Sequence, residues 1–192
     1  MAAKTSFYSA AELAELGFKS IGKNVLISRY ARFYGTSRIT LGNHVRIDDF
    51  CIVSAGSAII FGDYIHVACY ASLIGQGKIV LEDFTSVAAR STILSSCDDF
   101  SGASLVNPMI AEEFLNVMHA PVILKKHAVI GVGAVILPGV TLNEGCAVGA
   151  MSLVKYDIPA YQIWVGNPIR YIKDRLQNLK TLEREFLDAP QR

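Results

Sequence analysis

The sequence has almost no net charge and no long hydrophobic run. Its 192 residues carry 18 Lys and Arg against 17 Asp and Glu, a net charge of +1, and 52% of them are apolar. Such a balance excludes proteins that hold nucleic acid or acidic lipid through a strongly basic surface. Residues 128–143 form the longest stretch without a charged side chain, but they contain Pro138 and fall short of the ~20 apolar residues of a spanning helix. We therefore expect no nucleic-acid partner and no membrane insertion.

Cysteines are few, and the common catalytic motifs are missing. No two cysteines form a C-x-x-C pair, and the N-terminal stretch lacks the apolar core of a secretion signal. Reduced thiols and a cytoplasmic protein are therefore expected. No phosphate-binding glycine loop, nucleophile elbow or H-E-x-x-H zinc motif occurs, and no metal is expected. The cysteines are Cys51, Cys69, Cys97 and Cys146.

A repeat of six residues organises most of the chain. Between residues 21 and 159, every hexad begins with an aliphatic residue or Phe, and its fifth residue is mostly small. The early coils add two residues to every third hexad, which gives a period of twenty. The first positions are Ile21, Ile27, Phe33, Leu41, Ile47, Val53, Phe61, Val67, Leu73, Leu81, Val87, Ile93, Leu124, Ile130, Ile136, Leu142, Val148 and Val154.

This repeat predicts an all-β fold, a parallel β-helix. One large and one small residue of each hexad point inward from a short strand, and three hexads complete a triangular coil. Strands of successive coils then pair ~4.8 Å apart. An amphipathic helix would need apolar residues every 3.6 positions, which the repeat does not supply. Cys51, Cys97 and Cys146 are predicted to lie in the small inward column.

Two flanks and one insertion complete a single predicted domain, residues 1–192. An excursion of about twenty-five residues from a regular scaffold is usually functional, so we expect the insertion to be the active-site loop. The predicted segments are an N-terminal helical cap (1–20), β-helix coils (21–98 and 124–159), the loop (99–123) and a C-terminal segment with a helix (160–192).

The predicted terminal helices have recognisable starts. Ser9 and Glu12 have the spacing of a capping box ahead of an apolar residue, Leu13. Asn167-Pro168 is a typical helix start, and an apolar stripe follows it. Both helices are interpreted as covers over the ends of the solenoid. The stripe consists of Ile172, Leu176, Leu179, Leu182 and Phe186.

The hexads resemble the left-handed β-helix hexapeptide-repeat acyltransferases, with the pattern [LIV]-[GAED]-x-x-[STAV]-x. Over residues 81–170 the chain is similar to the galactoside, maltose and xenobiotic acetyltransferase branch. The resemblance implies left-handed coils, a homotrimer with active sites between chains, and acetyl-CoA or another acyl-CoA as co-substrate. The segments that carry it are residues 130–140, 148–154, 157–159 and 166–170.

The same resemblance implies a CoA site along the C-terminal coils. Val132 and Ala150 would lie against the pantetheine arm, because short side chains leave the strand backbone free to pair with its amides. Lys155, Arg170 and Lys173 would meet the phosphates, which cations recognise.

The acceptor site departs from the galactoside branch, because Asp98 stands where that branch carries a histidine base. A hydroxyl needs a base during attack, whereas a neutral amine is already nucleophilic. Asp98 and Asp99 suit a positively charged amino group, and His66 and Gln76 map near acceptor-binding positions. The loop resembles a polysaccharide-biosynthesis subgroup of sugar acyltransferases at residues 95–102 and 107–108. This implies N-acylation of a nucleotide-linked 4-amino-4,6-dideoxy sugar in surface-polysaccharide (lipopolysaccharide O-antigen) biosynthesis.

Two alternatives stay open. A sugar O-acetyltransferase would need a histidine base, for which His119, in the loop, and His66 are the candidates. A non-enzymatic or carbonic-anhydrase-like β-helix is more remote, because His44, His66 and His127 lack a recurring zinc-binding spacing. Asp98 and Asp99 also fit a plain turn around Ser101, so their role is a hypothesis.

Overall fold

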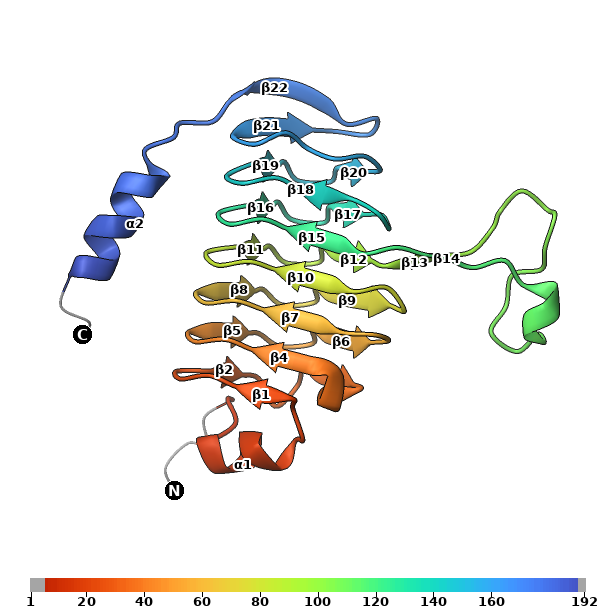
Figure 1. Cartoon of the computed structure of the whole chain (residues 1–192), viewed down its shortest axis with the longest axis horizontal. Coiled ribbons are helices and arrows are strands. Elements are labelled where there is room, and N and C mark those ends of the chain that lie inside the picture. The colour runs from red at the N-terminus through yellow and green to blue at the C-terminus, as the bar shows by residue number, and fades with distance from the viewer. Residues whose placement is uncertain (1–5, 190–192) are drawn as a thin grey trace.

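A computed structural model, which describes residues 6–189, shows the chain as a triangular solenoid with a projecting arm (Figure 1). Strands of successive coils pair in parallel in three sheets, which we call faces 1, 2 and 3. The predicted all-β parallel β-helix is confirmed. The chain passes from face 1 to face 2 to face 3 in each coil.

The strands of the solenoid are short, as the hexads require. Face 1 contains β1 (Ser20–Ile21), β4 (Ile39–Leu41), β7 (Ile59–Phe61), β10 (Ile79–Leu81), β15 (Val122–Leu124) and β18 (Thr141–Leu142). Face 2 contains β2 (Leu26–Ile27), β5 (Val45–Ile47), β8 (Ile65–Val67), β11 (Ser86–Val87), β16 (Val129–Ile130), β19 (Ala147–Val148), β21 (Gln162–Val165) and β22 (Arg170–Asp174). Face 3 contains β3 (Arg32–Tyr34), β6 (Ile52–Ala55), β9 (Ser72–Gly75), β12 (Thr92–Leu94), β17 (Val135–Ile136) and β20 (Leu153–Val154).

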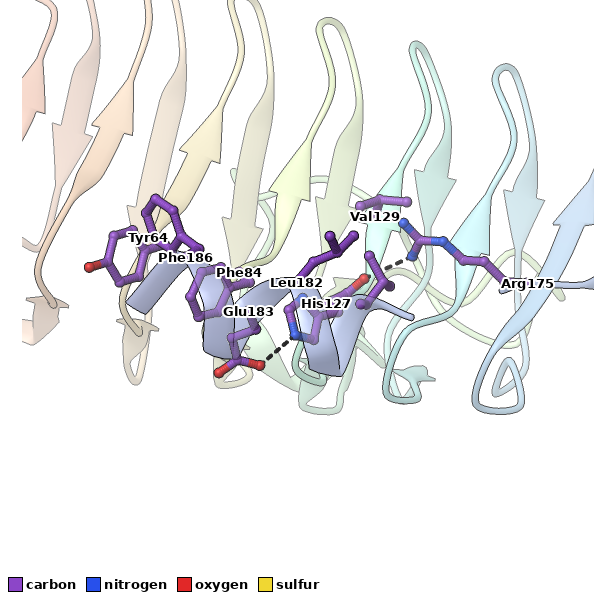
Figure 2. A pocket seen from close by; sticks show the side chains of 9 residues that line it. Tyr64, Phe84, His127, Val129, Arg175, Leu182, Glu183 and Phe186 are labelled. Atoms are coloured by element: carbon purple, nitrogen blue, oxygen red, sulfur yellow. Dashed lines mark hydrogen bonds and ion pairs between the residues drawn. The ribbon is translucent and has the colours of Figure 1, made fainter. Parts of the chain in front are cut away.

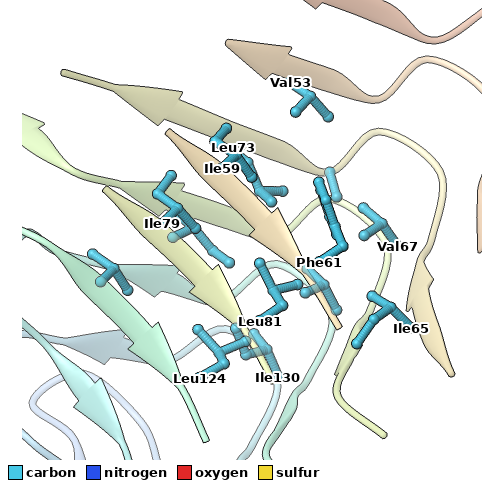
Figure 3. Close-up of a cluster of buried hydrophobic side chains, with 14 of the residues drawn as sticks. Val53, Ile59, Phe61, Ile65, Val67, Leu73, Ile79, Leu81, Leu124 and Ile130 are labelled. Carbon is cyan, nitrogen blue, oxygen red and sulfur yellow. The ribbon is translucent and has the colours of Figure 1, made fainter. Parts of the chain in front are cut away.

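The core is a set of stacked columns of inward side chains (Figure 3). On face 1, Phe61, Leu81 and Leu124 lie in register on neighbouring strands, and none is more than 1% exposed. Burying one such side chain contributes about 1.5–3 kcal/mol. The repetition of this contact from coil to coil holds the solenoid together.

On face 3 of the longer coils, the small inward side chain does not lie at the predicted fifth position of its segment. Cys51 and Cys146 are buried as expected, and burial raises the pKa of their thiols to about 11 and about 12. Cys97 is only partly buried, so its predicted inward position is wrong. The reason is that the third residue of the segment fills the small inward place on this side, Ala55 in one long coil and Ser95 in the coil of Cys97, whereas Cys97 pairs with Met118 where the chain leaves the coil.

The predicted N-terminal capping box is confirmed. The helix α1 (Ala10–Glu15) begins after Ser9, whose side chain accepts the Glu12 N–H, while the Glu12 carboxylate accepts the Ser9 N–H at 2.8 Å. Arg29 of the first coil donates to the same carboxylate at 2.6 and 2.7 Å and holds the pKa of Glu12 at about 2. Leu13 is buried against the solenoid. Residues 1–5 of the predicted cap lie outside the described residues.

The insertion forms an arm, residues 96–119, that projects away from the solenoid (Figure 1). Its neck is an antiparallel pair, β13 (Ser96–Cys97) and β14 (Met118–His119), and a 3-10 helix, η2 (Glu112–Phe114), lies near its tip. A second short 3-10 helix, η1 (Thr36–Arg38), sits in the first long corner. The predicted loop extends too far at its end, because residues 122–123 already belong to β15 and pair with β10.

The predicted helix start at Asn167-Pro168 is wrong. These residues lie in the turn between β21, which pairs in parallel with β19, and β22, which pairs with β21 antiparallel. The solenoid therefore continues to Val165, and β22 covers its open edge.

None of the described helices is long and apolar enough to cross a membrane.

The C-terminal helix α2 (Leu179–Asp188) runs back beside the solenoid (Figure 1). Phe186 packs edge-on against Tyr64 and Phe84, and His127 Nε2 lies 2.8 Å from a Glu183 carboxylate oxygen (Figure 2). Of the predicted stripe, Leu179, Leu182 and Phe186 lie on this helix, whereas Ile172 and Leu176 precede it and are exposed.

Candidate active site

Three polar groups meet where the arm leaves the solenoid. The backbone N–H of Gln76 donates to Ser96 Oγ at 2.7 Å, and Ser96 Oγ lies 2.8 Å from Nδ1 of His119. Gln76 follows β9, while Ser96 and His119 face each other across the neck. Gln76 and His119, which the sequence places far apart, are thus brought together by Ser96.

Glycines make this close approach possible. A Cβ on Gly75, whose φ is +139°, would come within 2.4 Å of Ser95 Oγ, and one on Gly77 would come within 2.5 Å of the Ala120 carbonyl oxygen. Any larger residue would push the neck away from the third corner of the coil. The sequence Gly75-Gln76-Gly77 therefore allows the neck of the arm to pack closely against the coil.

The two acidic residues at the base of the arm have different surroundings. The Asp99 carboxylate accepts the Ser101 N–H at 2.8 Å, Asn116 Nδ2–H at 3.2 Å and Ser104 Oγ–H at 3.4 Å. These bonds, the Ser101 N–H first, hold the pKa of Asp99 below its ordinary value. The Asp98 carboxylate is exposed and has no hydrogen-bond partner within residues 6–189. Asp99 thus orders the arm, and Asp98 is available to a ligand.

His66 belongs to a separate polar group on face 2. Its Nε2 lies 2.8 Å from Asp48 Oδ2, and Asp48 Oδ1 accepts Arg46 Nε–H at 2.7 Å. Burial raises the pKa of Asp48, but the hydrogen bonds from His66 and Arg46 outweigh it and leave that pKa lowered. Within one chain, His66 and the neck of the arm lie on different sides of the solenoid, because the arm leaves between faces 3 and 1.

The predicted CoA-binding residues lie at the C-terminal end of the solenoid. Val132 and Ala150 occupy equivalent corner turns one coil apart, where the Met151 N–H donates to the Val132 carbonyl at 2.8 Å. Lys155 follows β20, and Arg170 and Lys173 lie on β22. All three cations are exposed and form no ion pair with a described residue. They are free to meet an anion.

A cavity of about 380 Å³ lies between α2 and the solenoid, away from all of these groups (Figure 2). Its walls are mainly apolar and come from the packing of the helix, and no predicted site residue lines it. Its lining residues are Tyr64, Phe84, His127, Val129, Arg175, Leu179, Leu182, Glu183 and Phe186.

Sequence reasoning missed Ser96 and Asp48. Ser96 is one of several serines near the break in the repeat, and nothing in its spacing marks it. Asp48 was detectable in principle, since a carboxylate one coil before His66 and two residues further along is close enough to bond it.

Within residues 6–189, no three His, Cys, Asp or Glu side chains are grouped so as to hold a metal ion.

Comparisons with known proteins agree on one family. No protein-family model matches the sequence. The chain is 44% identical over 176 residues to the dTDP-4-amino-4,6-dideoxy-D-glucose acyltransferase of Escherichia coli, covering 91% of this chain and 92% of that protein.

Solved structures extend this likeness to three dimensions. AntD, an N-acyltransferase from Bacillus cereus, in complex with dTDP and 3-hydroxybutyryl-CoA, is 46% identical, covers 96% of this chain and 97% of its own, and superposes with a TM-score of 0.92. A mutant of AntD in complex with dTDP-4-amino-4,6-dideoxyglucose and coenzyme A superposes with a TM-score of 0.93 at 46% identity, covering 96% and 98% of the two chains. The chain belongs to the family of hexapeptide-repeat acyltransferases that contains these two enzymes.

Proposed function

We propose that this protein is an acyl-CoA-dependent N-acyltransferase that transfers an acetyl or another short acyl group to the amino group of a nucleotide-linked 4-amino-4,6-dideoxy sugar. The names and complexes of the two relatives, each matching more than nine-tenths of the chain, support this acceptor and this co-substrate. The observation that carries the proposal is Asp98, an exposed carboxylate without a partner among the described residues, at the base of an ordered arm.

The proposed reaction needs side chains mainly to bind and orient the acceptor. Asp98 binds and orients the ammonium form of the acceptor, which gives one proton to solvent and so becomes the neutral amine. The neutral amine attacks the thioester carbonyl carbon, so that a C–N bond forms and the C–S bond breaks. After the attack the nitrogen loses a second proton, which the departing CoA thiolate takes up. No side chain has to act as a strong base in this sequence of steps.

The co-substrate would follow the C-terminal coils. The small corner residues Val132 and Ala150 leave backbone groups accessible to the amides of pantetheine. Lys155, Arg170 and Lys173 supply positive charge for the phosphates, and their exposure without an ion pair to any described residue supports that role.

The proposal includes a homotrimer. The arm exposes large apolar side chains, with Met109 90% exposed, Phe100 81% and Phe114 57%. A projecting segment with such side chains is suited to cover by a second copy of the chain. Light scattering should give a mass near three times the 20.9 kDa of one chain, and a monomer at all concentrations would contradict it.

O-acylation is a second candidate, and the contact between His66 and Asp48 favours it. A carboxylate 2.8 Å from one ring nitrogen orients a histidine and leaves the other nitrogen to accept a proton. The pair lies on face 2, so it would serve an arm from a neighbouring copy. His66→Ala should cost roughly 10²- to 10⁴-fold in turnover if His66 is the base, and far less if the acceptor is an amine.

The same proposal includes a place in the cytoplasm, since both substrates would be activated intracellular metabolites. The acylated sugar would serve the assembly of surface polysaccharides such as O-antigen.

The proposal is tested by incubating the protein with acyl-CoA and dTDP-4-amino-4,6-dideoxyglucose. The release of free CoA and the mass of the sugar product are then measured. We expect equal amounts of free CoA and an acylated sugar whose amide bond resists hydroxylamine. A product formed only on hydroxyl acceptors and cleaved by hydroxylamine as an ester would establish the O-acylation alternative.

A further inference from the structure

The neck of the arm fixes the geometry of His119 more tightly than an exposed loop histidine would be fixed. The antiparallel pairing of β13 with β14 places His119 directly opposite Ser96. Ser96 is in turn held by the Gln76 N–H at 2.7 Å, and Gly75 and Gly77 let the neck sit against the coil. Ser96 Oγ then lies 2.8 Å from Nδ1 of His119. One nitrogen of the ring is therefore engaged, and the other is available.

The direction in which the Ser96 hydroxyl donates its hydrogen determines whether Nε2 of His119, the free ring nitrogen, donates or accepts a hydrogen bond. A serine hydroxyl has one hydrogen to donate and lone pairs to accept with. The Gln76 backbone can only donate, so it uses a lone pair of Ser96. An N–H bonded to an oxygen polarises the O–H on that oxygen and makes it a better donor. Among the contacts of Ser96 Oγ with described residues, Nδ1 of a neutral His119 is the group able to accept that hydrogen.

We infer that Ser96 is a positioning residue that holds neutral His119 in the tautomer with its proton on Nε2. His119 then presents an N–H donor to the bound substrates, and it does not serve as the general base. This inference rests on the proposed function, and it deepens it by giving His119 a role in N-acylation. The ligand of the donor is an oxygen with negative charge, either the thioester carbonyl oxygen during attack or a substrate phosphate.

The tautomer can be tested without any substrate. The free protein, labelled with ¹⁵N-histidine, is studied by two-bond ¹H–¹⁵N correlation at a pH where the rings are neutral, and His119→Gln assigns the signal. We expect His119 as the Nε2–H form, a mixture of both forms in Ser96→Ala, and a return to the Nε2–H form in Ser96→Thr, which keeps the hydroxyl. An Nδ1–H form in the unmodified protein would overturn the inference and leave the proposed function untouched.

Kinetics with the amino sugar test the role of the donor. His119→Gln keeps an N–H near the position of Nε2 but cannot act as a base, whereas His119→Ala removes both. We expect His119→Ala to lose roughly 10²-fold in kcat/KM, the scale of one oxyanion donor, and His119→Gln to keep most of the activity. A loss in kcat identifies the thioester oxygen as the ligand, and a rise in KM identifies a phosphate.

Equal, severe losses in the two His119 variants would show that a base is needed and would overturn the inference. Ser96→Ala should lower activity in the same parameter as His119→Ala but less severely, with Ser96→Thr restoring it. If the unmodified protein transfers no acyl group to the amino sugar, the proposed function fails, and the tautomer measurement still stands by itself.

Discussion

Replacing Asp98 with Asn keeps the shape of the side chain and removes the charge proposed to bind the acceptor. A hydrogen bond to a charged group contributes about 1.5–3 kcal/mol, and 1.36 kcal/mol corresponds to a factor of ten. Asp98→Asn should therefore lower kcat/KM for the amino sugar by about 10- to 150-fold, mostly through KM, with the KM for acyl-CoA unchanged. Initial rates of CoA release against sugar concentration measure both parameters.

Asp99→Asn is the matched control, because it makes the same chemical change one residue away. Asp99 bonds Ser101, Ser104 and Asn116 within the arm, so its loss should loosen the arm. We expect faster proteolysis of the arm in this variant, and a smaller rise in KM for the sugar than in Asp98→Asn. Normal binding of the amino sugar by Asp98→Asn, or a selective rise in its KM in Asp99→Asn alone, would exclude Asp98 as the group that binds the amine.

Two further predictions concern the co-substrate and acid stability. Arg170→Ala should raise the KM for acyl-CoA with little change in kcat, because a phosphate contact stabilises ground and transition states alike, and a lower kcat at unchanged KM would contradict the assignment. The pKa of Glu12 is lowered from 4.5 to about 2 by Arg29, so its stabilising effect is full above about pH 4.5 and is lost as the pH falls toward 2. Unfolding by denaturant between these pH values should show a shallower loss of stability in Glu12→Gln, whereas parallel curves would exclude the contribution.

The solenoid was predictable because the same burial problem recurs in every coil. Each hexad must place one large side chain inside, and a column such as Phe61, Leu81 and Leu124 repeats that solution. The exception, Cys97, falls where the arm leaves the solenoid, since Ser95 fills the small inward place and Cys97 pairs with Met118 in the neck. At the C-terminus, Asn167-Pro168 fits a helix start and a turn equally well by local propensity. The antiparallel pairing of β22 with β21 decides for the turn.

The candidate site was only partly predictable, because its details depend on how the arm folds. Asp98 and Asp99 have the same chemistry and adjacent positions, and only the folded arm shows that Asp99 is occupied by hydrogen bonds. Ser96 meets His119 through antiparallel pairing, which a six-residue repeat does not encode. The roles of the CoA-binding residues came from family resemblance, and the structure adds that the three cations are exposed and form no ion pair within residues 6–189.

A crystal structure of the protein with CoA and dTDP-4-amino-4,6-dideoxyglucose would show directly whether Asp98 binds the acceptor amine. We expect the sugar nitrogen to lie within hydrogen-bond distance of the Asp98 carboxylate, about 2.7–3.2 Å, and to face the sulfur of CoA. A complex in which the amino group lies away from Asp98, or in which the imidazole of His66 contacts a sugar hydroxyl beside the CoA sulfur, would contradict this expectation.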